Sequence, residues 1–124
     1  MIGKKRVVLW EDLESMPKAV PAMGTCKAFT KALGLTKMVV IVGRFAPGER
    51  LLLHYHNEPT EETYYVVAGR GTVHIRDEVV QVEKGMALSV PPGVPHYIVN
   101  TGKEILEVVF ILAPPQEQMT VYET

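Results

Sequence analysis

Two stretches of the chain carry most of the information about its fold: residues 48–69, GERLLLHYHNEPTEETYYVVAG, and residues 85–100, GMALSVPPGVPHYIVN. Both contain short runs of β-branched and aromatic residues, which favour strands. Turn-forming residues interrupt these runs at Asn57-Glu58-Pro59 and again at residues 91–95, PPGVP. The two stretches therefore predict short strands joined by tight turns, rather than helices.

The same pattern continues on both sides of these stretches. We expect strands over residues 38–45, 51–56, 62–67, 72–76, 79–82, 86–90, 96–99 and 105–112. A tight hairpin is expected at Asp77-Glu78. Many short strands with evenly spaced turns predict an all-β fold, either a sandwich or a barrel.

The two ends of the chain are less regular. Residues 7–10 are a candidate strand, residues 11–16 a candidate helical turn, and residues 24–35 are ambiguous. The polar tail from Pro114 is expected to be loosely held. Because no linker, low-complexity tract or internal repeat is present, we expect residues 1–124 to form one domain, with residues 1–36 packing on the barrel as an N-terminal extension.

Composition argues against two classes of partner. The 124 residues include thirteen basic and fourteen acidic ones, a formal net charge of -1, so no basic field attracts nucleic acid. The short basic cluster Lys4-Lys5-Arg6 is interpreted as a solvated end. No apolar run is long enough for a membrane span or a signal peptide. The single cysteine, Cys26, cannot form an intramolecular disulfide and is expected to be a small, partly buried side chain. These features favour a cytoplasmic protein without nucleic-acid or membrane partners.

Three of the four histidines lie in a pattern typical of metal ligands. His54 and His56 are two residues apart in an expected strand, so both side chains project from one face, with Cα atoms about 6.6 Å apart. Leu52 precedes them on that face, which indicates that the face is turned inward. His96 follows the stiff turn PPGVP, whose prolines restrict φ and whose Gly93 permits an unusual backbone angle. Such a turn is suited to fixing one ligand at the mouth of a barrel.

A carboxylate completes the set, and two residues compete for this position. Glu62 opens the next strand and can face the same interior, where a cation would compensate its buried charge. Glu61, its neighbour, is the alternative. Glu61, like Glu58, is better explained as a solvated loop acid, so Glu62 is favoured.

These residues resemble the two sequence motifs of the cupin family. The first motif is similar to Gly48, five residues, His54-Tyr55-His56, Glu62, six residues and Gly69. The second is similar to Gly85, five residues, Pro91-Pro92-Gly93, two residues, His96, three residues and Asn100. One departure is that the family commonly has three or four residues between the second histidine and the glutamate; Glu61 fits with four, whereas Glu62 requires five. The resemblance still favours Glu62, because it keeps the motif's six-residue interval to Gly69, and a slip of one residue in a strand would turn the side chain to the other face.

The resemblance implies a double-stranded β-helix, or jelly-roll β-barrel, with one divalent metal ion near its centre. It implies His54, His56, Glu62 and His96 as the metal ligands, and Mn, Fe, Ni, Co or Zn as the ion. The glycines and Asn100 of the motifs would shape turns. Small cupins often associate, so a homodimer is also implied, with residues 7–10 as a strand exchanged between subunits.

The resemblance leaves two functions open. The first is a metal-dependent enzyme, of dioxygenase, decarboxylase or isomerase type, acting on a small organic substrate. The second is a non-catalytic, metal-containing module that binds or senses a small ligand. Tyr64 shares strand parity with Glu62 and is the candidate catalytic hydroxyl. Arg44 is a candidate for binding a substrate carboxylate, although an exposed position is favoured, and His74 is expected at the surface or in packing.

Overall fold

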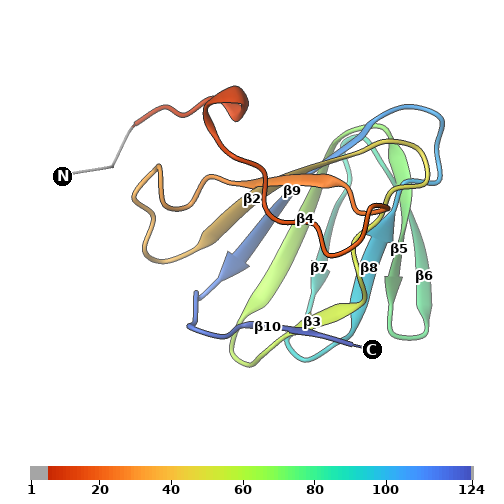
Figure 1. The fold of residues 1–124 in the computed structure, drawn as a ribbon. Helices are drawn as coiled ribbons and strands as arrows, with labels where there is room; N and C mark the ends of the chain where they lie inside the picture. Colours follow the sequence, from red (N-terminus) through yellow and green to blue (C-terminus); the bar gives the residue numbers. More distant parts are fainter. Residues whose placement is uncertain (1–5, 124) are drawn as a thin grey trace.

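The computed structural model describes residues 6–123, which form ten strands, one turn of 3-10 helix and no α-helix. Two five-stranded antiparallel sheets, in the orders β1-β2-β9-β4-β7 and β10-β3-β8-β5-β6, face each other (Figure 1). The elements are η1 (Trp10–Asp12), β1 (Thr25–Ala28), β2 (Val39–Phe45), β3 (His54–His56), β4 (Glu61–Ala68), β5 (Arg70–Ile75), β6 (Glu78–Glu83), β7 (Ala87–Val90), β8 (His96–Val99), β9 (Leu106–Ala113) and β10 (Thr120–Tyr122). The all-β, jelly-roll prediction is thereby confirmed.

The core lies between the two sheets and follows from the alternation of side chains along each strand. In β4 every second residue from Glu62 to Val66 is buried, and the residues between them are exposed. Strand β9 pairs with β4 and buries alternate residues in the same way. Because side chains alternate with a period of two, one face of each sheet supplies the core. The largest fully buried apolar side chains are those of Tyr64, Phe45, Ile98, Leu106, Val66, Val73 and Val108.

One part of the prediction requires correction, because the sheets do not close into a barrel. Within residues 6–123, β1 and β7 form the edges of one sheet, and β10 and β6 form the edges of the other. Strands β1 and β10 contain only four and three residues. Cys26 on β1 and Tyr122 on β10 line one pocket, which separates the two edges. The molecule is therefore a jelly-roll sandwich that is open on the side of the pocket.

The ends of the chain also differ from expectation. Residues 7–9 form no strand, and the expected helical turn is the short η1. The ambiguous region contributes β1, which pairs with β2 as an edge strand. The tail is not loosely held, since β10 pairs with β3. Lys4 and Lys5 of the basic cluster lie outside the described residues.

Two strand boundaries are also displaced from the predicted ones. The β5–β6 hairpin turns at residues 76–77 rather than 77–78, and Arg76 adopts a left-handed φ of 52° there. Strand β3 begins only at His54, because the preceding Leu51 donates its N–H to the Ile98 carbonyl outside the regular ladder. The remaining predicted strands agree with the structure to within two residues at either end.

Asn100 joins three segments at the end of the sandwich. Its side chain is buried, and Nδ2 donates to the Phe45 carbonyl at 2.7 Å and to the Glu104 carbonyl at 2.8 Å. Its Oδ1 accepts the N–H of Gly102 at 2.9 Å. The amide nitrogen thus donates two hydrogen bonds and the amide oxygen accepts one, which agrees with the expected turn-shaping position.

Candidate metal centre

The three predicted histidines lie on one sheet and face its interior. His54 and His56 occupy β3, where the intervening Tyr55 points the other way. His96 opens β8 and lies directly opposite His54 in the antiparallel register. The turn before it contains Gly93 in the left-handed region, at φ 76°, as the sequence suggested. Neighbouring strands therefore bring the imidazole centroids within 4.4 to 5.3 Å of one another.

The carboxylate comes from the opposite sheet. Glu62 is buried on β4 and its Oε1 lies 3.0 Å from His56 Nε2 and 2.9 Å from His96 Nε2. Glu61 precedes it and is exposed, so the structure brings Glu62 rather than Glu61 to the histidines. We name His54, His56, Glu62 and His96 the His/Glu cluster. One donor atom from each member lies within 4.8 Å of every other.

The hydrogen bonds of the cluster identify which imidazole nitrogens are free. Nδ1 of His54 donates to the Leu52 carbonyl at 2.7 Å, and Nδ1 of His96 donates to the Val94 carbonyl at 2.8 Å. A carbonyl only accepts, so both Nδ1 atoms carry a proton, and in the neutral ring Nε2 keeps a lone pair. The lone pair of His96 then faces a carboxylate oxygen at 2.9 Å. Two acceptors at this distance require a proton or a cation between them.

Burial and neighbouring charge set the protonation of the cluster. Burial, followed by the charge of His96, lowers the pKa of His54 from 6.5 to about 4. Burial alone would raise the pKa of Glu62, but in the metal-free protein the hydrogen bonds that form when a proton lies between Glu62 and the Nε2 atoms of His56 and His96 outweigh burial and hold this pKa below 4.5. At neutral pH the cluster therefore offers a neutral His54 and an ionised Glu62, which are the forms that bind a metal.

Acid should destabilise the metal-free protein through these two groups. Because the folded pKa of His54 lies below its unfolded value, the unfolded chain binds more protons between pH 6.5 and 4, so stability falls as pH falls through this range. Glu62 acts in the same direction below pH 4.5. We expect His54 alone to remove about 2 kcal/mol of unfolding free energy between pH 7 and pH 5.

Urea unfolding of chelator-treated protein at several pH values measures this loss. The variant His54→Asn is the matched control, because its amide can still donate to the Leu52 carbonyl but does not titrate. Equal pH slopes in the two proteins would contradict the assignment to His54.

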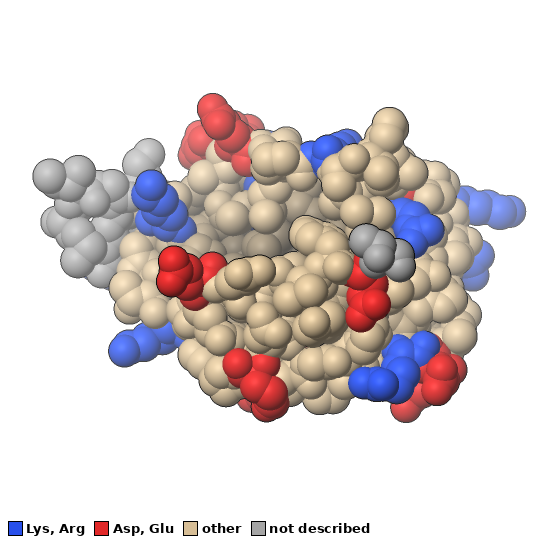
Figure 2. Space-filling model, turned by 60° about the horizontal axis from the view of Figure 1, so that its bottom comes forward, with Lys and Arg blue, Asp and Glu red and all other residues tan. Residues whose placement is uncertain are grey.

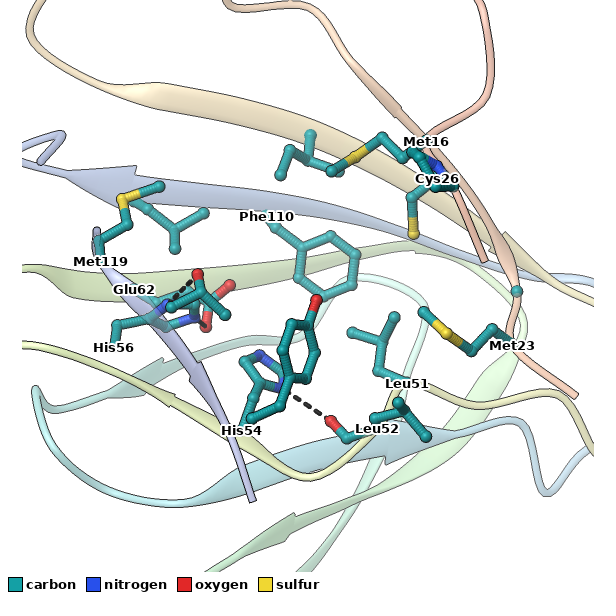
Figure 3. A pocket seen from close by; sticks show the side chains of 16 residues that line it. Met16, Met23, Cys26, Leu51, Leu52, His54, His56, Glu62, Phe110 and Met119 are labelled. Carbon is teal, nitrogen blue, oxygen red and sulfur yellow. Dashed lines mark hydrogen bonds and ion pairs between the residues drawn. The ribbon is translucent and has the colours of Figure 1, made fainter. Parts of the chain in front are cut away.

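An apolar pocket begins at the His/Glu cluster and opens between β1 and β10 (Figure 3). Its volume is about 130 Å³. Three members of the cluster, His54, His56 and Glu62, line the pocket, whereas His96 lies behind them. The face shown in Figure 2 is hollowed near its middle, and mainly uncharged residues surround the hollow.

Tyr64 points into the sandwich, but it does not line the pocket. Its ring packs edge-on against Phe110 at a centroid distance of 4.6 Å, and Phe110 forms part of the pocket wall. Burial, followed by the charge of Glu62, raises the pKa of Tyr64 well above 10. Its buried hydroxyl has no hydrogen-bond partner among residues 6–123. The catalytic role of Tyr64 stays a prediction.

Other singled-out residues lie away from the cluster. Arg44 is exposed on the outer face of β2, where it pairs with Glu107 at 2.6 Å and covers the Trp10 ring, so it does not reach the pocket. His74 stacks on Tyr97, as expected of a packing histidine. Cys26 lines the pocket, and burial raises the pKa of its thiol to about 11, although Lys18 opposes this. It is therefore a neutral wall residue rather than a nucleophile at pH 7.

The sequence reasoning missed Thr120. Strand β10 places Thr120 opposite His56, and its Oγ1 lies 3.1 Å from His56 Nδ1. This is the only Nδ1 of the cluster whose partner is a hydroxyl, which both donates and accepts. Thr120 is therefore positioned to accept from Nδ1 and leave Nε2 of His56 free. The β-branched and aromatic residues 120–122 were a weak strand signal that the polar tail concealed.

Loss of the Thr120 hydroxyl should weaken metal binding. Thr120→Val keeps the shape and strand propensity but removes the acceptor, and we expect the metal Kd to rise about tenfold. Thr120→Ser retains the hydroxyl and should stay within a few-fold of wild type. Competition with a chromophoric chelator measures both. A valine variant that binds as tightly as the serine variant would show that Thr120 does not orient His56.

Comparison with known proteins decides the family. A family model described as the cupin domain matches residues 41–112. This chain belongs to the cupin family. The matched residues include the whole His/Glu cluster of this cupin, but neither β1 nor β10. Within residues 6–123, no helix has the length and apolarity that a membrane span requires.

Two curated relatives illustrate the extent of the sequence similarity. An uncharacterized protein of Methanocaldococcus jannaschii is 38% identical over 68 residues, which cover 55% of this cupin and 54% of that protein. Protein SchB of Streptomyces halstedii is 37% identical over 81 residues, which cover 65% of this cupin and 58% of SchB. The chain thus spans about half the length of the curated relatives it matches.

Solved structures show the same fold. A sugar phosphate isomerase from Silicibacter pomeroyi, of the cupin superfamily, has a TM-score of 0.80 and 20% identity, covering 94% of this cupin and 81% of that chain. The oxalate decarboxylase of Lactobacillus farciminis has a TM-score of 0.77 and 21% identity, covering 90% of this cupin and 34% of that chain. At these identities the likeness concerns the fold alone.

Proposed function

We propose that this cupin binds one divalent metal ion on His54, His56, Glu62 and His96, and that it is a metal-dependent enzyme acting on a small, oxygen-bearing substrate. The observation that carries the proposal is the position of the cluster at the wall of an apolar pocket. A site serving only stability would have no need of this opening. Here three of the four donor residues face a space that fits a small molecule.

The donor set fits a metal of the first transition series. Three imidazoles and one carboxylate suit Mn, Fe, Co, Ni and Zn, and bonds of about 2.1 Å place neighbouring donors about 3 to 4 Å apart. The separations in the cluster, up to 4.8 Å, require only a small contraction. A cation also resolves the facing acceptors of His96 and Glu62. When bound, the ion supplies a Lewis acid, which polarises a substrate oxygen.

The protein's own residues hold and shield this site. The Leu52 and Val94 carbonyls fix the rings of His54 and His96, and Thr120 fixes that of His56. Glu62, buried and ionised, balances part of the ion's charge. Apolar walls exclude water from the reacting groups and strengthen electrostatic interactions there. Reactions that need little further acid–base help, such as dioxygenation or decarboxylation, suit this arrangement best, whereas isomerisation through an enol would also need a group that moves a proton.

One observation favours a second candidate, a metal-containing binding or sensing module without turnover. Apart from the cluster, the protic side chains that line the pocket within residues 6–123 are Cys26, Thr120 and Tyr122. The Cys26 thiol is neutral and Thr120 is engaged with His56. A reaction that demands a dedicated proton donor and acceptor would find few groups here.

Reconstitution separates the two candidates. Chelator-stripped protein is loaded with Mn, Fe(II), Co, Ni or Zn, and bound metal is counted. Oxygen uptake, carbon dioxide release and isomer formation are then followed over small acids, enols and phenols. We expect one equivalent of metal and turnover with at least one ion. One equivalent of metal with ligand binding but no turnover would contradict the enzyme proposal and support the non-catalytic binding module.

Tyr64→Phe adds a test of the predicted catalytic hydroxyl. The oxygen that this substitution removes has no partner among the described residues, so the fold should be unharmed. A fall in turnover with unchanged metal content would assign Tyr64 to the reaction. Unchanged turnover would show that the Tyr64 hydroxyl takes no part in the reaction.

A further inference from the structure

The walls of the pocket differ sharply from its metal-binding end. His54, His56 and Glu62 lie at one end, and beyond them the lining is almost entirely apolar, including Met23, Leu52 and Phe110 (Figure 3). Met16 lies across the pocket from His56 and Glu62, beside Cys26. Met16, Met23 and Met119 contribute three flexible, polarisable side chains, which adapt to flat or irregular apolar groups. A ligand that fills this space therefore meets hydrocarbon and sulfur along most of its length.

Among the described residues, no side chain that lines the pocket supplies a counter-charge for a second anionic group; Lys18, whose charge acts on the Cys26 thiol, does not itself line the pocket. Within residues 6–123, no Lys or Arg lines it, and its only carboxylate is Glu62 in the cluster. Arg44, the arginine that the sequence suggested for this purpose, lies on the outer face and is paired with Glu107. A carboxylate or phosphate on the far part of a ligand would lose its hydration without gaining a partner, which costs several kcal/mol. Burial of apolar surface, by contrast, makes the free energy of binding more favourable.

We infer that this cupin selects small ligands with one oxygen-bearing, metal-chelating head and an uncharged, apolar body, such as an aryl or alkyl 2-oxo acid or enol. The inference rests on the proposed metal site, because the head is bound through the ion. It excludes dianions and phosphorylated sugars as preferred ligands. The apolar body lies along Phe110 and the methionines and gives the pocket its selectivity.

A matched series of 2-oxo acids tests the inference on cobalt-loaded protein. Pyruvate, 2-oxoglutarate and 2-oxo-4-phenylbutanoate share one chelating head and differ in the body, which is a methyl group, a charged chain or a phenylethyl group. Binding is read from the cobalt absorption spectrum and from calorimetry, without reference to turnover. We expect the phenyl compound to bind at least tenfold more tightly than pyruvate, and 2-oxoglutarate to bind no more tightly than pyruvate.

A charge placed in the wall should invert this order. Met16 is 39% exposed and its N–H is bonded to the Cys26 carbonyl, so Met16→Arg keeps the backbone bond and its charge can reach solvent. This variant should bind 2-oxoglutarate about tenfold more tightly than wild type does, and the phenyl compound less tightly. Met16→Leu is the matched control and should keep the wild-type order.

The outcomes separate this inference from the proposed function. Equal affinities for the three acids, or tightest binding of 2-oxoglutarate to wild type, would overturn the inference while metal binding stands. A cobalt spectrum that none of the acids perturbs would also overturn it. Failure to bind cobalt at all would overturn the metal site and the inference with it.

Discussion

His96→Ala should reduce metal affinity at least a hundredfold, so that the purified variant holds almost no ion. His96 is fully buried, and it is the proposed ligand that follows the turn containing Gly93. Its Nδ1 is bonded to the Val94 carbonyl, and its Nε2 lies against Glu62. Without the ring, a site with four donors keeps three, and Glu62 loses one of its two imidazole partners. The measurement is metal content after dialysis, together with a Kd from chelator competition.

A second variant distinguishes loss of a metal ligand from loss of the fold. His96→Asn has an amide that can still donate to the Val94 carbonyl, but it is too short to present a donor at the position of Nε2. It should remain folded by circular dichroism and still fail to hold metal. His74→Ala is the control, since His74 stacks on Tyr97 outside the cluster. This variant should keep one equivalent of bound metal. One equivalent of tightly bound metal in His96→Asn would show that His96 is not a ligand.

Local sequence patterns predicted the central strands and the placement of the cluster. Alternation has a fixed period of two, so once the motif's interval to Gly69 sets the register, the burial of Glu62 together with Tyr64 and the exposure of Glu61 follow. The same rule explains why His54 and His56 share a face. It also explains the outward position of Arg44, because its neighbours Gly43 and Phe45 are buried.

The features that could not be predicted depend on contacts between distant segments. Strand β10 has three residues and pairs with β3, where Thr120 lies opposite His56, 64 positions earlier in the sequence; no local pattern shows this pairing. The same pairing delivers Thr120 to His56. Closure of the sheets into a barrel depends likewise on which edge strands pair, and within residues 6–123 the edge strands β1 and β10 do not pair with each other. The pocket could therefore not be predicted from local runs of residues.

Asn100→Ala should lower the free energy of unfolding by about 4 kcal/mol, although Asn100 lies outside the proposed metal site. The amide of Asn100 is 2% exposed and binds the Phe45 carbonyl, the Glu104 carbonyl and the Gly102 N–H. Alanine leaves these three buried or partly buried backbone groups without partners. Each unsatisfied group costs about 1 to 3 kcal/mol, so the sum is a large part of a small domain's stability. The thermal midpoint should fall by about 15 °C.

Two further variants distinguish lost hydrogen bonds from lost volume. Asn100→Asp preserves the volume and the acceptor for Gly102, but it turns a carboxylate oxygen toward the carbonyls of Phe45 and Glu104. It should be at least as destabilising as alanine, because two acceptors then face each other in a buried site. Asn57→Ala removes one exposed bond to the Gln118 carbonyl and should cost less than 1 kcal/mol. Urea unfolding compares the three proteins. An aspartate variant close to wild-type stability would mean that the donor bonds of Asn100 contribute little, and that packing around the turn holds the three segments together.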